Sequence, residues 1–127
     1  MTLTTSSYRL WRPDHGIPVR VSVGPPRWLQ VPLVEWETVY PPWSLVRGKL
    51  PEVDYRRRYR HGLHKLTPKI LAELHDLEAG YDAPLVLLCH CDLLVSNTWC
   101  HRRFLAEWIS QHTGETIPEL TDLTTQT

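Results

Sequence analysis

The sequence predicts one small α/β domain, Rossmann-like and three-layered, with a small and mostly parallel sheet. Three observations favour this fold class. A continuous apolar run at 85–89 has the composition of a strand that is buried on both faces. Residues 18–23 alternate apolar and polar side chains, as a half-buried strand does. Helical periodicity is found between these two strands, from about residue 52 to 80, and again after the strand at 85–89.

The N-terminal part supplies two of the expected strands. Residues 3–8 are rich in Thr, Ser and Tyr, which indicates a short strand. The second strand, 18–23, ends at the Gly-Pro-Pro sequence of 24–26. Residues 28–43 fit either a strand or a covering loop, and their prolines favour irregular structure.

Two helices are expected in the middle of the chain. The first begins after Pro51, with acidic residues in its first turn and basic residues toward its end, as the helix dipole favours. The second begins at Pro68 and ends at Gly80, a residue that commonly terminates helices.

A last helix is expected from about residue 99 to 112, closed by Gly114. The polar residues 121–127 are typical of a flexible C-terminal tail. The domain is therefore expected to cover 1–120.

Composition excludes several classes of protein. The 14 basic and 14 acidic residues balance, which argues against a duplex nucleic-acid binder. No apolar stretch approaches the roughly 20 residues that span a bilayer, and the N-terminus lacks a signal-peptide pattern. Three cysteines without such a signal predict reduced thiols in a cytoplasm.

The strongest chemical signal lies between 89 and 102. Cys100, His101 and Arg102 fall in the first turn of the last expected helix, where free backbone N–H groups and the helix dipole favour anions and activate thiols. The guanidinium of Arg102 adds donors suited to phosphate. The structural alternative is that Cys100 is simply buried, His101 is exposed and Arg102 solvates the surface.

Other candidates should meet this helix at the carboxyl ends of the strands, where such folds bind ligands. The first strand would bring hydroxyls, and the six tryptophans offer flat walls for an aromatic ligand. The alternative is that Ser6 and Ser7 satisfy backbone groups and Trp28 covers the core. The predicted ligand-binding residues are Ser6, Ser7, Tyr8, Arg27, Trp28, Cys89, Cys91, Trp99, Cys100, His101 and Arg102.

The spacing of the cysteines argues against a zinc site. Cys89 and Cys91 could join Cys100 and His101 as ligands, but their spacing departs from common zinc motifs. Cys89 also continues an apolar strand, where cysteine is an ordinary core residue. We therefore predict no metal and no cofactor.

The common sequence motifs for binding phosphate groups or nucleotides do not fit this chain. His90-Cys91 at a strand end is similar to the cysteine phosphatases, but Asn97 stands where their arginine would be, and 92–96 lacks glycine. The sequence has neither a Gly-x-Gly-x-x-Gly nor a Walker pattern.

The chain combines an apolar strand at 84–89 with a Cys-His-Arg helix start at 100–102, which Leu-Ala-Glu-Trp follows at 105–108. In these elements it resembles the domain of unknown function 488 family, and the resemblance extends to 5–8, 22–28 and 113–120. It implies a Rossmann-like fold and a cytoplasmic setting, bacterial or phage, without an established activity. Cys91 stands where many relatives carry an acidic residue, so a role for that carboxylate is not transferred.

Three hypotheses about function follow. The leading one is a binding protein for a small anionic, nucleotide-derived ligand, which could sequester a signalling nucleotide in phage anti-defence. Its anchors would be Arg27, Arg102 and the backbone near Cys100 and His101, with Trp28 or Trp99 stacking.

The second hypothesis is an enzyme that uses Cys100 as nucleophile or His101 as general acid and base on a phosphorylated substrate. The third is a nucleic-acid or protein interaction module that uses the basic run 56–61, although the balanced charge argues against nucleic acid. Whether the protein forms a homo-oligomer stays open.

Overall fold

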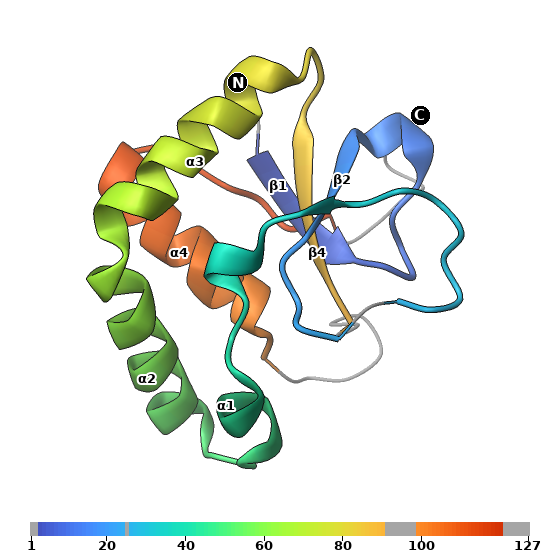
Figure 1. Ribbon diagram of the computed structural model, residues 1–127. Coiled ribbons are helices and arrows are strands. Elements are labelled where there is room, and N and C mark those ends of the chain that lie inside the picture. Colours follow the sequence, from blue (N-terminus) through green and yellow to red (C-terminus); the bar gives the residue numbers. More distant parts are fainter. Residues whose placement is uncertain (1–2, 25, 91–98, 121–127) are drawn as a thin grey trace.

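The computed structural model describes residues 3–24, 26–90 and 99–120, and Figure 1 shows their arrangement. Three strands come first, three helices follow, and one more strand and helix end the described part, with two short 3-10 turns (η1 and η2) among the first strands and before the first helix. In order, the elements are β1 (Leu3–Ser7), η1 (Pro13–His15), β2 (Ile17–Arg20), β3 (Val34–Glu35), η2 (Glu37–Val39), α1 (Trp43–Arg47), α2 (Glu52–Lys65), α3 (Thr67–Gly80), β4 (Leu85–Cys89) and α4 (His101–Thr113).

The strands form one four-stranded sheet in which every pairing is parallel. Its order is β1-β4-β2-β3. Leu85 of β4 pairs with Leu3 on one side and with Ile17 on the other, so β4 is the central strand. These observations confirm the α/β class and the parallel, Rossmann-like sheet.

The sequence of β4 matches this central position. All five of its residues are buried, as the continuous apolar run predicts for a strand covered on both faces. Side chains alternate between the faces, so Leu85 and Leu87 join one apolar cluster while Val86 and Leu88 join another.

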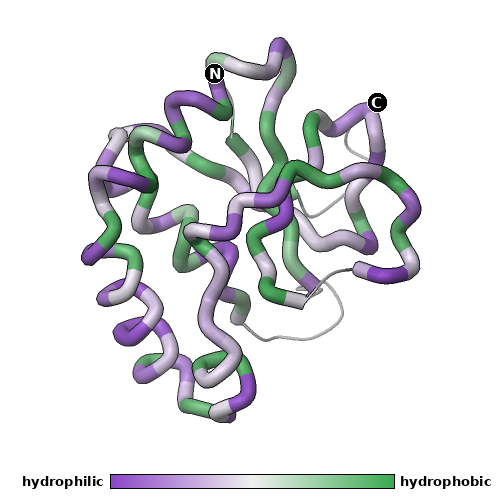
Figure 2. The backbone as a smooth tube through the Cα atoms, in the orientation of Figure 1, coloured by the Kyte–Doolittle hydropathy of each residue, from purple (hydrophilic) through white to green (hydrophobic). Residues whose placement is uncertain are grey.

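Helices cover one face of the sheet. Figure 1 shows α2, α3 and α4 together on that side. Tyr55, Tyr59 and Leu63 recur every four residues along α2 and are all buried, whereas Val53 of the same helix is 74% exposed. Figure 2 shows the matching mixture of hydrophilic and hydrophobic positions along α2 and α3.

Loops cover the other face of the sheet in the part of the chain that the structure describes. Val86 and Leu88 pack there with Tyr8, and partly buried residues complete the layer: Trp11, Leu29, Leu33 and Leu120. The third layer is thus built from 8–16, 26–33 and 118–120, with η1 as its helical turn.

The C-terminal segment also covers the edge of β1. The Thr5 amide donates to the carbonyl of Pro118 at 3.0 Å, and the Leu120 amide donates to the carbonyl of Thr5 at 2.8 Å. These bonds satisfy backbone groups that an open edge strand would leave exposed.

The expected strands and helices are confirmed with shifts at their ends. β2 stops at Arg20, before the expected residue 23, because the chain curls around that side chain. The Arg20 guanidinium donates to the carbonyls of Ser22 and Val23 at 3.0 and 2.6 Å. The last helix begins at His101, since Cys100 is still extended, and it ends at Gly114 in the left-handed conformation as expected.

The ambiguous region 28–43 is mostly irregular, as expected, but it also contains β3 and η2. The five-residue helix α1 follows it and was not predicted. Within 3–24, 26–90 and 99–120, every helix is too short or too polar to traverse a bilayer.

Candidate functional site

A pocket of about 420 Å³ lies at the carboxyl ends of β2 and β4. Parallel strands bring these ends to one edge of the sheet, which is where open α/β folds bind ligands. Residues after each strand and at the start of α4 line it, together with α1 and α2: Ser22, Val23, Gly24, Pro41, Trp43, Val46, Tyr55, His90, Trp99, Cys100 and His101.

Three aromatic residues give the pocket flat walls. The ring centroids of Tyr55 and Trp99 lie 4.7 Å apart, and Trp99 stacks on Phe104 at 5.5 Å, so Trp99 is held from behind. Trp43 is 47% exposed, and the guanidinium carbon of Arg47 lies 4.7 Å from its ring centroid. A wall with one fixed and one exposed ring suits a flat ligand.

A chain of hydrogen bonds ties three strand ends together beside the pocket. The Ser22 hydroxyl donates to the carbonyl of Gly24 at 2.8 Å, so the Tyr8 hydroxyl, 2.7 Å from Ser22 Oγ, is the donor of that pair. His90 Nε2 also reaches the Gly24 carbonyl, at 2.8 Å. A carbonyl only accepts, so His90 Nε2 carries a proton and donates it.

The fold brings two of the predicted cysteines and the predicted histidine into one buried cluster. The Sγ atoms of Cys89 and Cys100 are paired as in a disulfide, which departs from the reduced thiols that the sequence predicts. The three ligand atoms that Cys89, Cys100 and His101 offer all lie within 4.8 Å of one another. Cys100 and His101 also line the pocket, so the cluster borders it.

His101 is buried and held by the backbone. Its Nε2 lies 3.0 Å from the carbonyl of Val21, which fixes the proton on that nitrogen. Burial is the main reason that its pKa falls to about 4, and the neighbouring charges of Arg102 and His90 lower it further. The Val21 hydrogen bond opposes this shift only in part.

Arg102 is fully buried, and a carboxylate holds it in place. Its Nε and Nη2 donate to the two oxygens of Glu119 at 3.0 and 2.6 Å, and Nη1 donates to Cys89 Sγ at 3.0 Å. It is not among the residues that line the pocket. The sequence predicts Arg102 either as an anchor for the ligand or as a charge on the surface. The buried position does not match a surface charge, and Glu119 already accepts from the nitrogens that an anionic ligand would use.

The hydroxyls of the first strand are used inside the fold. Ser6 Oγ donates to the Leu120 carbonyl at 3.4 Å, and Ser7 Oγ accepts from the Leu10 amide at 3.2 Å. Both side chains are fully buried. This agrees with the alternative in which Ser6 and Ser7 satisfy backbone groups.

The remaining predicted residues fall in different places. Trp28 is 59% exposed and lines an adjoining pocket of about 410 Å³ with Tyr8, Arg9 and His90. Arg27 is exposed and lines neither pocket. Cys91 lies outside the described residues.

His90 is the residue that sequence reasoning passed over, and it lines both pockets. Its position directly after β4 was the available signal, since residues that follow parallel strands reach the ligand edge. Trp43 and Tyr55 were also missed as pocket residues. Only the packing of α1 and α2 brings them there.

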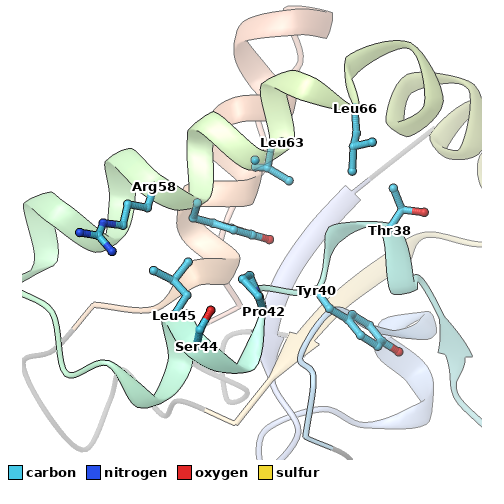
Figure 3. A pocket seen from close by; sticks show the side chains of 10 residues that line it. Thr38, Tyr40, Pro42, Ser44, Leu45, Arg58, Leu63 and Leu66 are labelled. Carbon is cyan, nitrogen blue, oxygen red and sulfur yellow. The ribbon is translucent and has the colours of Figure 1, made fainter.

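Another hollow, of about 340 Å³, lies between α1, α2 and the segment 38–42, and Figure 3 shows its lining. Leu45, Leu63 and Leu66 give it apolar walls, and Arg58 is its one charged lining residue. None of its lining residues comes from the carboxyl ends of β2 and β4.

The basic run 56–61 is partly neutralised by neighbours. Arg56 pairs with Glu107 of α4, and Arg57 donates to Asp54 at 3.1 Å. Arg60 donates to Gln111 at 2.6 Å. This run therefore serves contacts between α2 and α4, which weakens the case for a nucleic-acid surface.

Comparison with known proteins adds no relative: no family model, no curated protein and no solved structure matches the chain. The resemblance to the domain of unknown function 488 family therefore stays a prediction. The function has to be argued from the site itself.

Proposed function

We propose that this protein binds a small anionic ligand with a flat ring, of the nucleotide class, in the pocket at the carboxyl ends of β2 and β4. The observation that carries the proposal is a pocket of about 420 Å³ with aromatic walls at this edge of a parallel sheet. The volume suits a ligand of nucleotide or drug size.

The aromatic walls support the ring. Trp43 is largely exposed although it is a large apolar side chain, and Trp99 is braced by Tyr55 and Phe104. A base entering between Trp43 and Trp99 would bury apolar surface without reorganising either wall. Such stacking contributes about 1–3 kcal/mol per base.

The surroundings of the pocket support the anionic group. The helix α4 begins there with Cys100 as N-cap and without a side-chain cap in the part of the chain described, so its positive end faces the pocket. Arg47 is exposed and does not line the pocket itself, but its guanidinium lies over the ring of Trp43, which does. Arg47 and the start of α4 thus take the anchoring role that the sequence had suggested for Arg102.

If the protein is located in the cytoplasm of a bacterium or of the host of a phage, its pocket would meet signalling nucleotides. Sequestration of one of them is the concrete form of the proposal. It requires tight retention of the ligand without chemical change.

Calorimetric titration with a panel of mononucleotides, dinucleotides and cyclic nucleotides tests the proposal. We expect a nucleotide to bind and to be recovered unchanged, and the matching nucleoside to bind more weakly. Trp43→Ala should weaken binding about 10-fold or more, because one stacking contact is lost.

Trp28→Ala is the matched control, since Trp28 is an exposed tryptophan of the adjoining pocket. It should leave the affinity unchanged. Failure of every nucleotide to bind, or an equal loss in both variants, would reject this pocket as the site.

One observation favours an enzyme as the second candidate. Cys100 Sγ lies 3.9 Å from His101 Nδ1, and both residues line the pocket. A thiol beside an unprotonated imidazole nitrogen can act as a nucleophile on a phosphorylated substrate. Conversion of the bound nucleotide by the unaltered protein, lost in Cys100→Ser, would establish this candidate over sequestration.

A further inference from the structure

We propose that Cys89, Cys100 and His101 form a metal site that takes a zinc ion through two thiolates and one imidazole. The proposal is independent of the nucleotide, because it rests on the buried cluster between β4 and α4. No other part of the fold is needed to supply these three ligands.

The ligand types and their spacing fit zinc. Thiolate and imidazole are the ligands that zinc prefers, at about 2.3 Å for sulfur and 2.0–2.1 Å for nitrogen. Tetrahedral coordination at these lengths separates sulfur from nitrogen by about 3.6 Å. Cys100 Sγ and His101 Nδ1 already lie 3.9 Å apart, and all three ligand atoms lie within 4.8 Å.

The histidine is oriented as a metal ligand. His101 Nε2 donates to the Val21 carbonyl at 3.0 Å, so the lone pair of Nδ1 points toward the sulfur atoms. Zinc-bound histidines characteristically donate their other ring N–H to a carbonyl or carboxylate, which fixes the tautomer. This bond holds the ring ready before any ion arrives.

The surrounding charges favour thiolates. Arg102 Nη1 donates to Cys89 Sγ at 3.0 Å, and Glu119 neutralises the same guanidinium through its other nitrogens. Two thiolates and a zinc ion sum to zero, as Arg102 and Glu119 do. A buried site with balanced charge avoids the penalty of an unpaired ion.

The backbone spacing favours a shared ion over a direct bond between the sulfurs. The Cα atoms of Cys89 and Cys100 are 8.0 Å apart, whereas disulfides hold them at about 4.4–6.8 Å. Two thiolates on a tetrahedral zinc stand about 3.8 Å apart. A wider backbone gives the sulfurs room to separate by that amount.

The site borders the pocket through two of its ligands. Cys100 and His101 line the pocket while Cys89 lies behind them at the end of β4. Three protein ligands leave the fourth zinc position to water or to a bound molecule. A structural zinc site has four protein ligands, whereas the open fourth position here would let the ion contact a molecule bound in the pocket.

The test uses the full chain, reduced and stripped of metal, and titrates it with Zn²⁺ and with Co²⁺. We expect one ion per chain. The cobalt form should show the thiolate-to-metal charge-transfer absorption and the strong visible bands of tetrahedral coordination. Cys89→Ser, Cys100→Ser and His101→Gln should each weaken zinc binding by more than about 10-fold, which is what losing even an outer partner of a ligand costs.

His75→Gln is the control, because His75 is an exposed histidine on α3. It should bind zinc as the unaltered chain does. Equal losses in His75→Gln and His101→Gln would overturn the proposal. A cobalt form without thiolate charge transfer would overturn it too, and this measurement needs no variant.

The mass of the protein as purified tests the alternative that Cys89 and Cys100 form a disulfide instead of a metal site. A chain two hydrogens lighter that binds no zinc after reduction would mean that Cys89 and Cys100 are a disulfide pair, and the metal site would be rejected. Zinc binding without a nucleotide, or the reverse, would distinguish this proposal from that of the preceding section.

Discussion

At the scale of single residues, the most consequential interaction is the buried ion pair of Arg102 and Glu119. Arg102 has no exposed surface, and the Glu119 side chain is 11% exposed. The pair joins the start of α4 to the segment that covers β1. Each charge is tolerated in the interior because the other one is present.

Removing one partner should therefore cost far more than removing both. Glu119→Gln is expected to lower the free energy of unfolding by about 3–5 kcal/mol, because it removes the negative charge of a carboxylate that pairs with a buried guanidinium. Arg102→Met combined with Glu119→Leu should lose less than the sum of the single variants. Urea unfolding of the three variants measures this coupling, and additive losses would contradict it.

Tyr59 gives a second prediction, on pH. Burial raises the pKa of its phenol well above 10.0, with a smaller contribution from Tyr55. The unfolded chain releases this proton near pH 10 while the folded chain keeps it, so unfolding is favoured above about pH 10. The stability due to Tyr59 is complete below that pH and is lost as the pH rises further.

Tyr59→Phe should reveal both parts of this contribution. Near neutral pH the variant should be about 1–3 kcal/mol less stable, because the Tyr59 hydroxyl donates to the buried Val39 carbonyl at 2.6 Å. The difference should shrink above about pH 10. Chemical unfolding at both pH values checks this, and a constant difference would contradict it.

Residue types near the site could be read from the sequence, but their partners could not. The sequence spacing of Cys89, Cys100 and His101 matches no common zinc motif, so the sequence alone does not predict a zinc site at these residues. The pairing of β1, β4 and β2 and the entry of α4 bring these residues together. Glu119 pairs with Arg102 from 17 positions away, and nothing local indicates such a partner.

At the scale of elements, the turn before β2 depends on a glycine. Gly16 has a φ of 135°, and its backbone approaches β4 so closely that an added Cβ would lie 2.3 Å from the Pro84 carbonyl oxygen. The Ile17 amide donates to that same carbonyl at 2.8 Å. The first contact between β2 and β4 thus requires the absence of a side chain.

Gly16→Ala should destabilise the protein by about 1–3 kcal/mol, since it adds a clash to an unfavourable φ. Gly62→Ala, in the interior of α2, is the matched control, because nothing lies within 4 Å of the added carbon. It should stabilise the protein by about 0.5–1 kcal/mol. Thermal unfolding of both should give shifts of opposite sign.

The predictable elements are those with a strong internal pattern. The apolar run of β4, the periodicity of α2 and the glycine after α4 each determine their own element. β3 has two residues and exists because it pairs with β2, so no local pattern indicates it. α1 has five residues and lacks a side-chain cap, and its position depends on packing against α2.

At the scale of the whole molecule, the C-terminal segment completes the sheet. Residues 118–120 cover β1 by backbone hydrogen bonds, and Glu119 also accepts from the Thr5 hydroxyl at 2.6 Å. The same segment supplies the counter-charge of Arg102. Its loss would expose a strand edge and also remove the carboxylate that pairs with the buried Arg102.

A chain that ends after Ile117 should therefore be less stable and should self-associate through β1. A chain that ends after Leu120 keeps these contacts and should behave as the 127-residue chain does. Sedimentation and urea unfolding compare the two. Equal behaviour would show that β1 needs no cover.

The central position of β4 also has a consequence for how the protein is made. β1 and β2 flank β4 and do not pair with each other, so neither can complete its hydrogen bonds to the sheet until residues 85–89 have left the ribosome. Up to that moment the nascent chain can build α2 and α3, whose backbone hydrogen bonds are local, but not the core of the sheet or the packing of α2 on α4. The sheet can therefore assemble only after β4 has been made, and β1 and β2 have to stay apart from other chains until then.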